Sequence, residues 1–116
     1  MPKTLTWTTA ILTFAFANMA QAEIASSSTA CSSEASAQAR KLMTFHVGMD
    51  EPDMHVDETV KPLPSIVNPR DHRQRFDVLE VHGYWYKAEY RMRLEYYRIG
   101  DECVLVGQEI LELASL

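Results

Sequence analysis

Residues 84–99, YWYKAEYRMRLEYYRI, alternate apolar and polar side chains with a period of two. The apolar positions of this stretch are Tyr84, Tyr86, Ala88, Tyr90, Met92, Leu94 and Tyr96. Successive side chains of a strand point to opposite faces of a sheet, so the pattern predicts one long antiparallel strand with one buried face. Such a strand needs further strands beside it and an apolar layer over its buried face.

The segments around this stretch predict the rest of the sheet. Residues 76–82, FDVLEVH, and residues 103–113, CVLVGQEILEL, are predicted as neighbouring strands. Gly83 is predicted as a break or bulge, Gly107 as a bulge in the last strand, and residues 100–101 as a two-residue hairpin turn. Residues 61–71 contain three prolines, which lack the N–H that a central strand needs, so they are predicted at an edge or in an ordered loop.

Residues 32–47 are predicted as the helix that covers the sheet. The positions spaced by three and four residues, which share one helix face, are Ala35, Ala39, Leu42, Met43 and His46. Gly48 follows and favours helix termination. The predicted fold class is α+β: one N-terminal helix packed on a three- to four-stranded antiparallel meander. The layout is similar in outline to cystatin-like folds, but the chain carries no cystatin motif residues, so the resemblance implies an architecture and no function.

The first residues, 1–22, are predicted as a secretory signal peptide. Lys3 precedes an uncharged apolar run, and Ala20 and Ala22 are small residues at the positions that a signal peptidase reads. The run is too short to cross ~30 Å of hydrocarbon, which argues against a membrane anchor. Cleavage between Ala22 and Glu23 would leave one domain, residues 23–116, with a loose leader over residues 23–31. We therefore expect a periplasmic or secreted protein.

Cys31 and Cys103 are the two cysteines of the chain. In an oxidising compartment two cysteines of a small domain are expected to pair. The disulfide would join the start of the helix to the last strand, and closing a loop of roughly 70 residues contributes up to about 4 kcal/mol. Lipidation of Cys31 is the alternative, because residues 28–31, STAC, resemble a lipobox, although Ser28 stands where a Leu-type residue is expected.

The charge and the missing motifs exclude several classes of function. The formal net charge is −5, whereas nonspecific binding to nucleic acid or to anionic lipid needs excess positive charge. The sequence lacks G-x-S-x-G, H-E-x-x-H and a phosphate-binding glycine-rich loop, and the disulfide would consume both thiols. We therefore expect no enzyme and no cofactor, and a small hydrolase ranks last among the hypotheses.

The charged face of the long predicted strand is the favoured binding face. It consists of Trp85, Lys87, Arg91, Arg93 and Tyr97. Exposed aromatic residues next to arginine are typical of interface hot spots. This composition favours an exported protein that acts by contact with another exported protein, in an inhibitor, immunity or assembly-accessory role. The alternative for Trp85 is that a bulge at Gly83 turns its ring into the core.

Residues 43–55, MTFHVGMDEPDMH, give a second hypothesis, a periplasmic copper-binding or metal-carrier protein. Thioether and imidazole groups suit Cu(I), and the ligands would be Met43, His46, Met49 and His55. The competing interpretation assigns Met43 to the helix core, and places His46 at the helix C-terminus, where the dipole favours a cation. The spacing matches no metal motif with a defined mechanism, so the competing interpretation is favoured.

Overall fold

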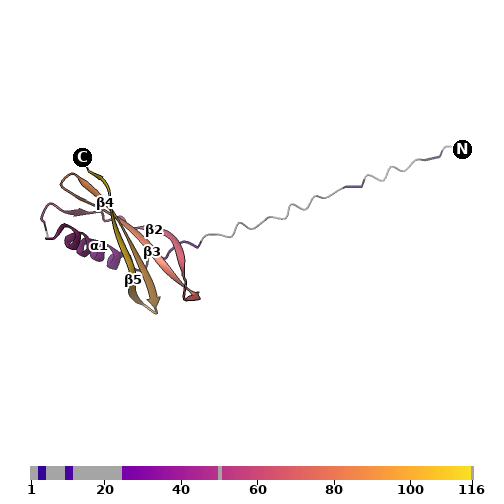
Figure 1. Ribbon diagram of the computed structural model, residues 1–116. Helices are drawn as coiled ribbons and strands as arrows, with labels where there is room; N and C mark the ends of the chain where they lie inside the picture. Colours follow the sequence, from indigo (N-terminus) through magenta and orange to yellow (C-terminus); the bar gives the residue numbers. More distant parts are fainter. Residues whose placement is uncertain (1–2, 5–9, 12–24, 50, 116) are drawn as a thin grey trace.

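Figure 1 shows the protein as a computed structural model, which describes residues 3–4, 10–11, 25–49 and 51–115. The predicted cleavage site between Ala22 and Glu23, and most of the predicted signal peptide, lie outside these residues. None of the helices in the described part of the chain combines the length and the hydrophobicity that a membrane span requires. The elements in chain order are α1 (Ser32–Val47), β1 (His55–Val56), β2 (Lys61–Asn68), β3 (Asp71–Trp85), β4 (Ala88–Ile99) and β5 (Glu102–Ser115).

The strands form one antiparallel sheet, and α1 packs on one of its faces. β2, β3, β4 and β5 follow each other as a meander, while the short β1 pairs with β3 beyond the end of β2. In Figure 1 the helix lies against one face of the twisted sheet, and the β2–β3 and β4–β5 hairpins extend past it. The predicted α+β class, with one helix on an antiparallel meander, is confirmed.

The helix has the predicted bounds, Ser32–Val47. Gly48 ends it with φ 97°, a left-handed conformation that glycine adopts without a Cβ clash, and its N–H donates to the Thr44 carbonyl at 2.9 Å. Four members of the predicted stripe are buried, but His46 is exposed. His46 lies in the last helical turn, at the rim of the core, where its ring meets the edge of the Tyr90 ring at a centroid distance of 5.4 Å.

The core lies between the helix and the inner face of the sheet. Burial alternates along β4, and the even positions predicted to face the core from Tyr90 to Tyr96 are buried. The strand register places Leu79 opposite Leu94 and Val81 opposite Met92. The buried residues that form the continuous core are Cys31, Ala35, Ala39, Leu42, Met43, Met54, Leu79, Val81, Tyr90, Met92, Leu94 and Tyr96.

The prediction of one strand over residues 84–99 is wrong. β3 continues through Gly83 to Trp85, and the chain then turns at Tyr86 and Lys87 before β4 begins at Ala88. Tyr86 has φ 58°, a left-handed conformation that residues other than glycine rarely adopt. The turn therefore contains none of the residue types that usually indicate a hairpin in a sequence. Its side chain is 88% exposed, in contrast to the buried position that the alternation predicts.

Gly83 is neither a break nor a bulge, because β3 pairs with β4 in regular register on both sides of it. It lies on the inner face of β3 opposite Tyr90, directly below the helix. A Cβ at this position would overlap the sulfur of Met43 and would lie 3.0 Å from the terminal carbon of Met92. Glycine is therefore needed here because the helix side chain approaches the strand backbone closely.

The edge of the sheet formed by β2 is covered by the end of the leader, residues 25–31, which was predicted to be loose. Ser26 forms a β-bridge with Pro64 of β2, and the Ser27 N–H donates to the Leu63 carbonyl at 3.0 Å. The buried Ser27 hydroxyl accepts a hydrogen bond from the Val78 N–H at 2.6 Å. These bonds fix the described part of the leader, because they satisfy backbone groups that an edge strand leaves unpaired. β2 is an edge strand as predicted.

The disulfide is formed as predicted. Cys31 precedes α1 directly and Cys103 is the second residue of β5; their sulfurs are 2.06 Å apart and their Cα atoms 5.9 Å apart. Both cysteines of the chain are consumed, which leaves no thiol for the lipidation alternative at Cys31. The bond joins the first residues of the helix layer to the edge strand of the sheet layer, so it links the two layers that enclose the core.

The last strand contains a bulge one residue before Gly107, where it was predicted. The register moves from Glu95 opposite Gly107 to Tyr96 opposite Leu105, so Val106 is an extra residue in β5. A second shift, between the pairs of Glu89 and Tyr90, makes Leu113 an extra residue near the end of the same strand. The stretch of β5 between the two bulges pairs regularly with β4.

Candidate functional site

The face of the sheet opposite α1, called the outer face below, is the candidate binding surface. Among the described residues, α1 is the one helix, and it packs on the inner face. The outer-face side chains of β4 are those that alternate with the core positions, namely Glu89, Arg91, Arg93, Glu95 and Tyr97. These β4 side chains are partly accessible, whereas Val78 and Glu80 of β3, on the same face, are buried.

The structure brings together three of the five residues of the predicted binding face. Arg91, Arg93 and Tyr97 are half-buried on the outer face of β4, as the alternation predicts. Lys87 is exposed in the β3–β4 turn. Trp85 lies opposite Ala88 on the inner side and packs against the core, because the turn at residues 86–87 separates it from β4. The inward alternative for Trp85 is thus the observed one, although the cause is the turn and not a bulge.

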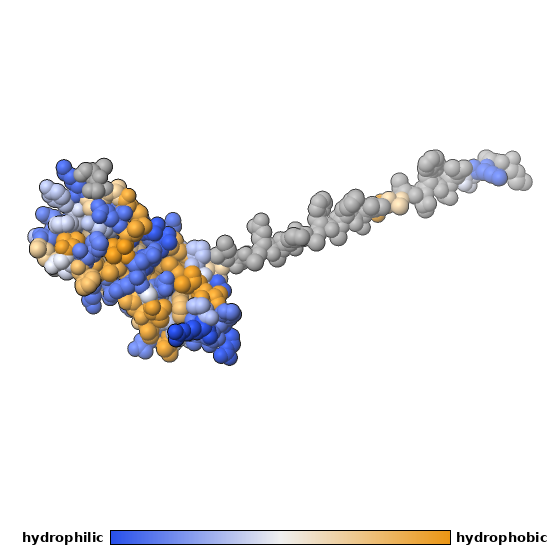
Figure 2. Space-filling view, in the orientation of Figure 1, coloured by the Kyte–Doolittle hydropathy of each residue, from blue (hydrophilic) through white to orange (hydrophobic). Residues whose placement is uncertain are grey.

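An apolar row crosses the outer face near the hairpin ends; it consists of Ile66, Phe76, Tyr97 and Val104. Ile66 is the cross-strand partner of Phe76, and Tyr97 is the partner of Val104. The Phe76 and Tyr97 rings meet edge to face with centroids 6.1 Å apart. Ile66 is 40% exposed and Val104 is 36% exposed. Figure 2 shows apolar surface toward the β4–β5 hairpin, beside the hydrophilic β2–β3 turn.

A charged row crosses the outer face further along the strands; it consists of Lys61, Glu80, Arg93 and Glu109. Glu80 is only 8% exposed, and its carboxylate accepts a hydrogen bond from the Arg93 Nε at 3.0 Å. Arg93 also approaches Glu109 at 3.8 Å, and Arg91 approaches the same carboxylate at 3.6 Å. Arg93 and Arg91, which lie two and three outer-face positions before Tyr97 on β4, are therefore held in place by carboxylates of neighbouring strands.

His82 completes this network through both ring nitrogens. Its Nε2 lies 3.0 Å from Glu80 and its Nδ1 lies 3.2 Å from Glu89, so a doubly protonated ring donates to both carboxylates. The hydrogen bond to Glu80 raises the pKa of His82, against the opposing effect of burial, and Glu89 adds to the increase. Burial alone would raise the pKa of Glu80, but the hydrogen bonds from His82 and Arg93 outweigh it and lower that pKa.

These two shifts define where the network stabilises the fold. Because the folded pKa of His82 is raised above 6.5, its contribution is complete below about pH 6.5 and is lost as the pH rises through the folded pKa. Because the folded pKa of Glu80 is lowered below 4.5, its contribution is complete above about pH 4.5 and is lost as the pH falls. Both contributions are therefore present together between pH 4.5 and 6.5.

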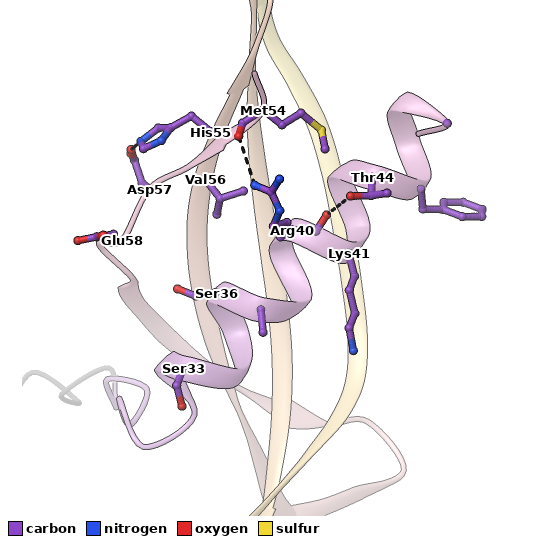
Figure 3. A pocket seen from close by; sticks show the side chains of 13 residues that line it. Ser33, Ser36, Arg40, Lys41, Thr44, Met54, His55, Val56, Asp57 and Glu58 are labelled. Atoms are coloured by element: carbon purple, nitrogen blue, oxygen red, sulfur yellow. Dashed lines mark hydrogen bonds and ion pairs between the residues drawn. The ribbon is translucent and has the colours of Figure 1, made fainter. Parts of the chain in front are cut away.

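A separate groove of about 1350 Å³ lies between α1 and residues 54–58 (Figure 3). The Arg40 guanidinium donates to the Met54 carbonyl at 3.2 Å and so links the helix to the opposite wall. Lys41 and Thr44 lie on the helix side of the groove, and the acidic Asp57 lies on the other wall. The walls of the groove therefore carry charges of both signs.

The four predicted copper ligands have different surroundings. Met43 is fully buried in the core, and His46 contacts Tyr90 at the rim. Met49 is exposed beyond the helix end, while the imidazole of His55 lies 3.3 Å from Asp57. Within the described ranges, no group of three or more His, Cys, Asp or Glu side chains is arranged to hold a metal ion. Met43 packs in the core, as the competing interpretation assigns it, and the copper hypothesis stays a prediction.

Comparison of the chain with protein-family descriptions, curated proteins and solved structures found no match. The apolar row was missed at the sequence level, apart from Tyr97, because its four members come from four strands and their alignment depends on strand register. Phe76 and Ile66 are large apolar residues, one in a predicted strand and the other in the predicted edge segment. Local periodicity did not show which residues of other strands they would pack against.

Proposed function

We propose that the protein is an exported binding protein that attaches to another exported protein through the outer face of its sheet. The observation that carries the proposal is the apolar row of Ile66, Phe76, Tyr97 and Val104, which spans four strands on the face opposite the helix. Together with Arg91 and Arg93 of the same face, the row combines aromatic, aliphatic and guanidinium groups, the composition that dominates interface hot spots.

The construction of this face supports binding. The members of the row sit on paired strands, so their backbone is ordered before a partner arrives and little conformational entropy is lost on association. Arg93 is oriented by Glu80 at 3.0 Å, and an arginine with a fixed guanidinium is better prepared for a directed contact than a mobile one. An interface centred on the row would have an apolar centre and a charged rim.

The disulfide supports export. Disulfides persist in oxidising compartments such as the periplasm and the extracellular space, and are rare in reducing ones. The bond between Cys31 and Cys103 agrees with the signal peptide that the first 22 residues predict. We therefore propose that the partner is met in the periplasm or outside the cell.

Capture of the partner from the exported fraction of the producing cells tests the proposal. Tagged wild-type protein is expected to recover a specific protein, and Val104→Lys and Ile66→Lys are each expected to reduce its recovery at least about tenfold, since each places a charge in the apolar centre. Phe45→Lys is the matched control: Phe45 is 86% exposed on α1, away from the outer face, and this variant should recover the partner as the wild type does.

Circular dichroism must show that all three variants are folded; each replaces an accessible side chain, so a change of stability within about 0.5 kcal/mol is expected. Equal recovery of the same partner by the wild type and both outer-face variants would sink the proposed surface.

A further inference from the structure

The two edges of the sheet are built differently. The edge formed by β2 contains Pro62 and Pro64, has two register irregularities, and is covered by the strand-like pairing at Ser26. The opposite edge is β5, which is 14 residues long and contains no proline. In the described part of the chain, β5 pairs with β4 on one side and with nothing on the other. Proteins usually protect such an edge, since it presents unpaired backbone donors and acceptors.

β5 is interrupted by two bulges, and the stretch between them is regular. The extra residues Val106 and Leu113 interrupt its pairing with β4, and bulges of this kind discourage the addition of another strand. Between them, Gln108, Glu109, Ile110, Leu111 and Glu112 continue a regular ladder. The charge of Glu109 is directed to its own sheet, where Arg91 and Arg93 lie 3.6 and 3.8 Å from it. The Glu109 carboxylate therefore does little to prevent another strand from pairing with this edge.

We propose that a second copy of the chain pairs with this regular stretch, antiparallel and about a two-fold axis at Ile110. Side chains alternate between the two faces of a strand, so two directly paired residues share a face of the joined sheet only if their numbers are both even or both odd. The axis must therefore pass through a residue and not between two residues. An axis at Glu109 would oppose two carboxylates, and an axis at Leu111 would bring the bulged Leu113 into the ladder. The axis at Ile110 avoids both.

The pairing about Ile110 is self-complementary. It places Ile110 opposite Ile110 of the second copy, Glu109 opposite Leu111, and Gln108 opposite Glu112, where the amide can donate to the carboxylate. No two carboxylates face each other, although β5 itself carries acids and no cation. A strand that avoids like charges when paired with itself favours a second copy over an unrelated strand. The two sheets then form one continuous sheet.

The consequence for the molecule is a doubled outer face. The two-fold axis is perpendicular to the sheet, so both copies of α1 lie on one side and both apolar rows lie on the other. The dimer would present two equivalent outer faces next to each other. This inference is independent of the proposed partner, because the apolar row lies outside the stretch from Gln108 to Glu112 and is not consumed by the pairing.

Charge variants at Leu111 test the register. Leu111 is 48% exposed and faces Glu109 of the second copy in the proposed pairing. Leu111→Glu creates two like-charge pairs per dimer and is expected to raise the dissociation constant about tenfold or more, whereas Leu111→Lys creates two opposite-charge pairs and is expected to leave it unchanged or lower. The effect of each new charge on Arg91 of the same chain is equal in monomer and dimer, so it cancels.

Sedimentation velocity over a concentration series gives the measurement, with the protein expressed from its full 116-residue sequence and purified with its disulfide intact. The wild type is expected to dimerise reversibly. Val106→Glu is the control and should leave the dissociation constant unchanged. Val106 is similarly exposed but lies in the bulge, outside the paired stretch. A wild type that stays monomeric at every concentration, or a dimer weakened equally by Glu and Lys at position 111, would overturn the proposal.

Discussion

The close approach of Met43 to Gly83 makes Gly83→Ala the most informative single substitution. A Cβ there would overlap the Met43 sulfur, and it would lie 3.0 Å from the terminal carbon of Met92. Both methionines are fully buried, so neither can move into solvent. Overpacking of this kind costs about 1–3 kcal/mol, while replacing glycine in the unfolded chain returns about 0.4–1 kcal/mol. We expect a net loss of about 1–2 kcal/mol.

Urea unfolding followed by circular dichroism measures this loss. With a slope of about 1 kcal/mol/M for a small domain, the midpoint should fall by about 1–2 M without a change in slope. Gly107→Ala is the matched control: its Cβ would lie 2.5 Å from the Glu95 carboxylate, but that side chain end can rotate away. We expect a change within about 0.5 kcal/mol for this variant.

A double-mutant cycle with Met43→Ala isolates the contact. Met43→Ala alone should cost about 2–5 kcal/mol, because it leaves a cavity in the core. Adding Gly83→Ala to that variant fills part of the cavity, so the double variant should be more stable than the sum of the two single effects by about 1 kcal/mol. The reasoning would be refuted if the Gly83→Ala variant were as stable as the wild type, or if the effects of the two substitutions on the free energy of unfolding were strictly additive.

Further expectations concern the disulfide, the charged network and the helix end. Replacing Cys31 and Cys103 together by Ala should lower the free energy of unfolding by about 4 kcal/mol, because the bond spans 72 residues; urea unfolding of the wild type in reductant should agree. Wild-type stability should fall on either side of pH 4.5–6.5, and His82→Gln should flatten the alkaline side whereas His72→Gln on the surface should not. Gly48→Ala should cost about 1–2 kcal/mol by thermal unfolding, owing to its φ of 97°.

Local patterns predicted much of the fold. The spacing of apolar residues in α1 and the glycine after it gave the bounds of the helix, because both signals lie within a few residues of each other. The alternation in β4 gave its buried face for the same reason. The disulfide could be predicted because only two cysteines are present in the chain.

The β3–β4 hairpin could not be predicted from local patterns. Gly83 carries the residue type expected at a turn, yet it is required by the packing of Met43, which lies 40 residues earlier by sequence number. The actual turn uses Tyr86 in a left-handed conformation, for which the sequence contains no signal. This displacement also reversed the inferred direction of Trp85.

The candidate site depended on information that no single segment contains. Arg91, Arg93 and Tyr97 were placed on one face by the period of their own strand. Ile66 and Val104 join Tyr97 only because three strand pairings align them. Strand register is set by the whole sheet, including its bulges, so the apolar row became visible only in the folded protein.

The position of the disulfide also determines how the protein responds to proteolysis. Residues 31–103 form a covalent loop that contains α1, β1, β2, β3 and β4. A protease that cuts once at the exposed residues 58–59, between β1 and β2, would produce two fragments that remain one molecule. The nicked protein would keep its full mass in a non-reducing gel and separate into two bands after reduction, so a single cleavage need not detach the helix from the sheet.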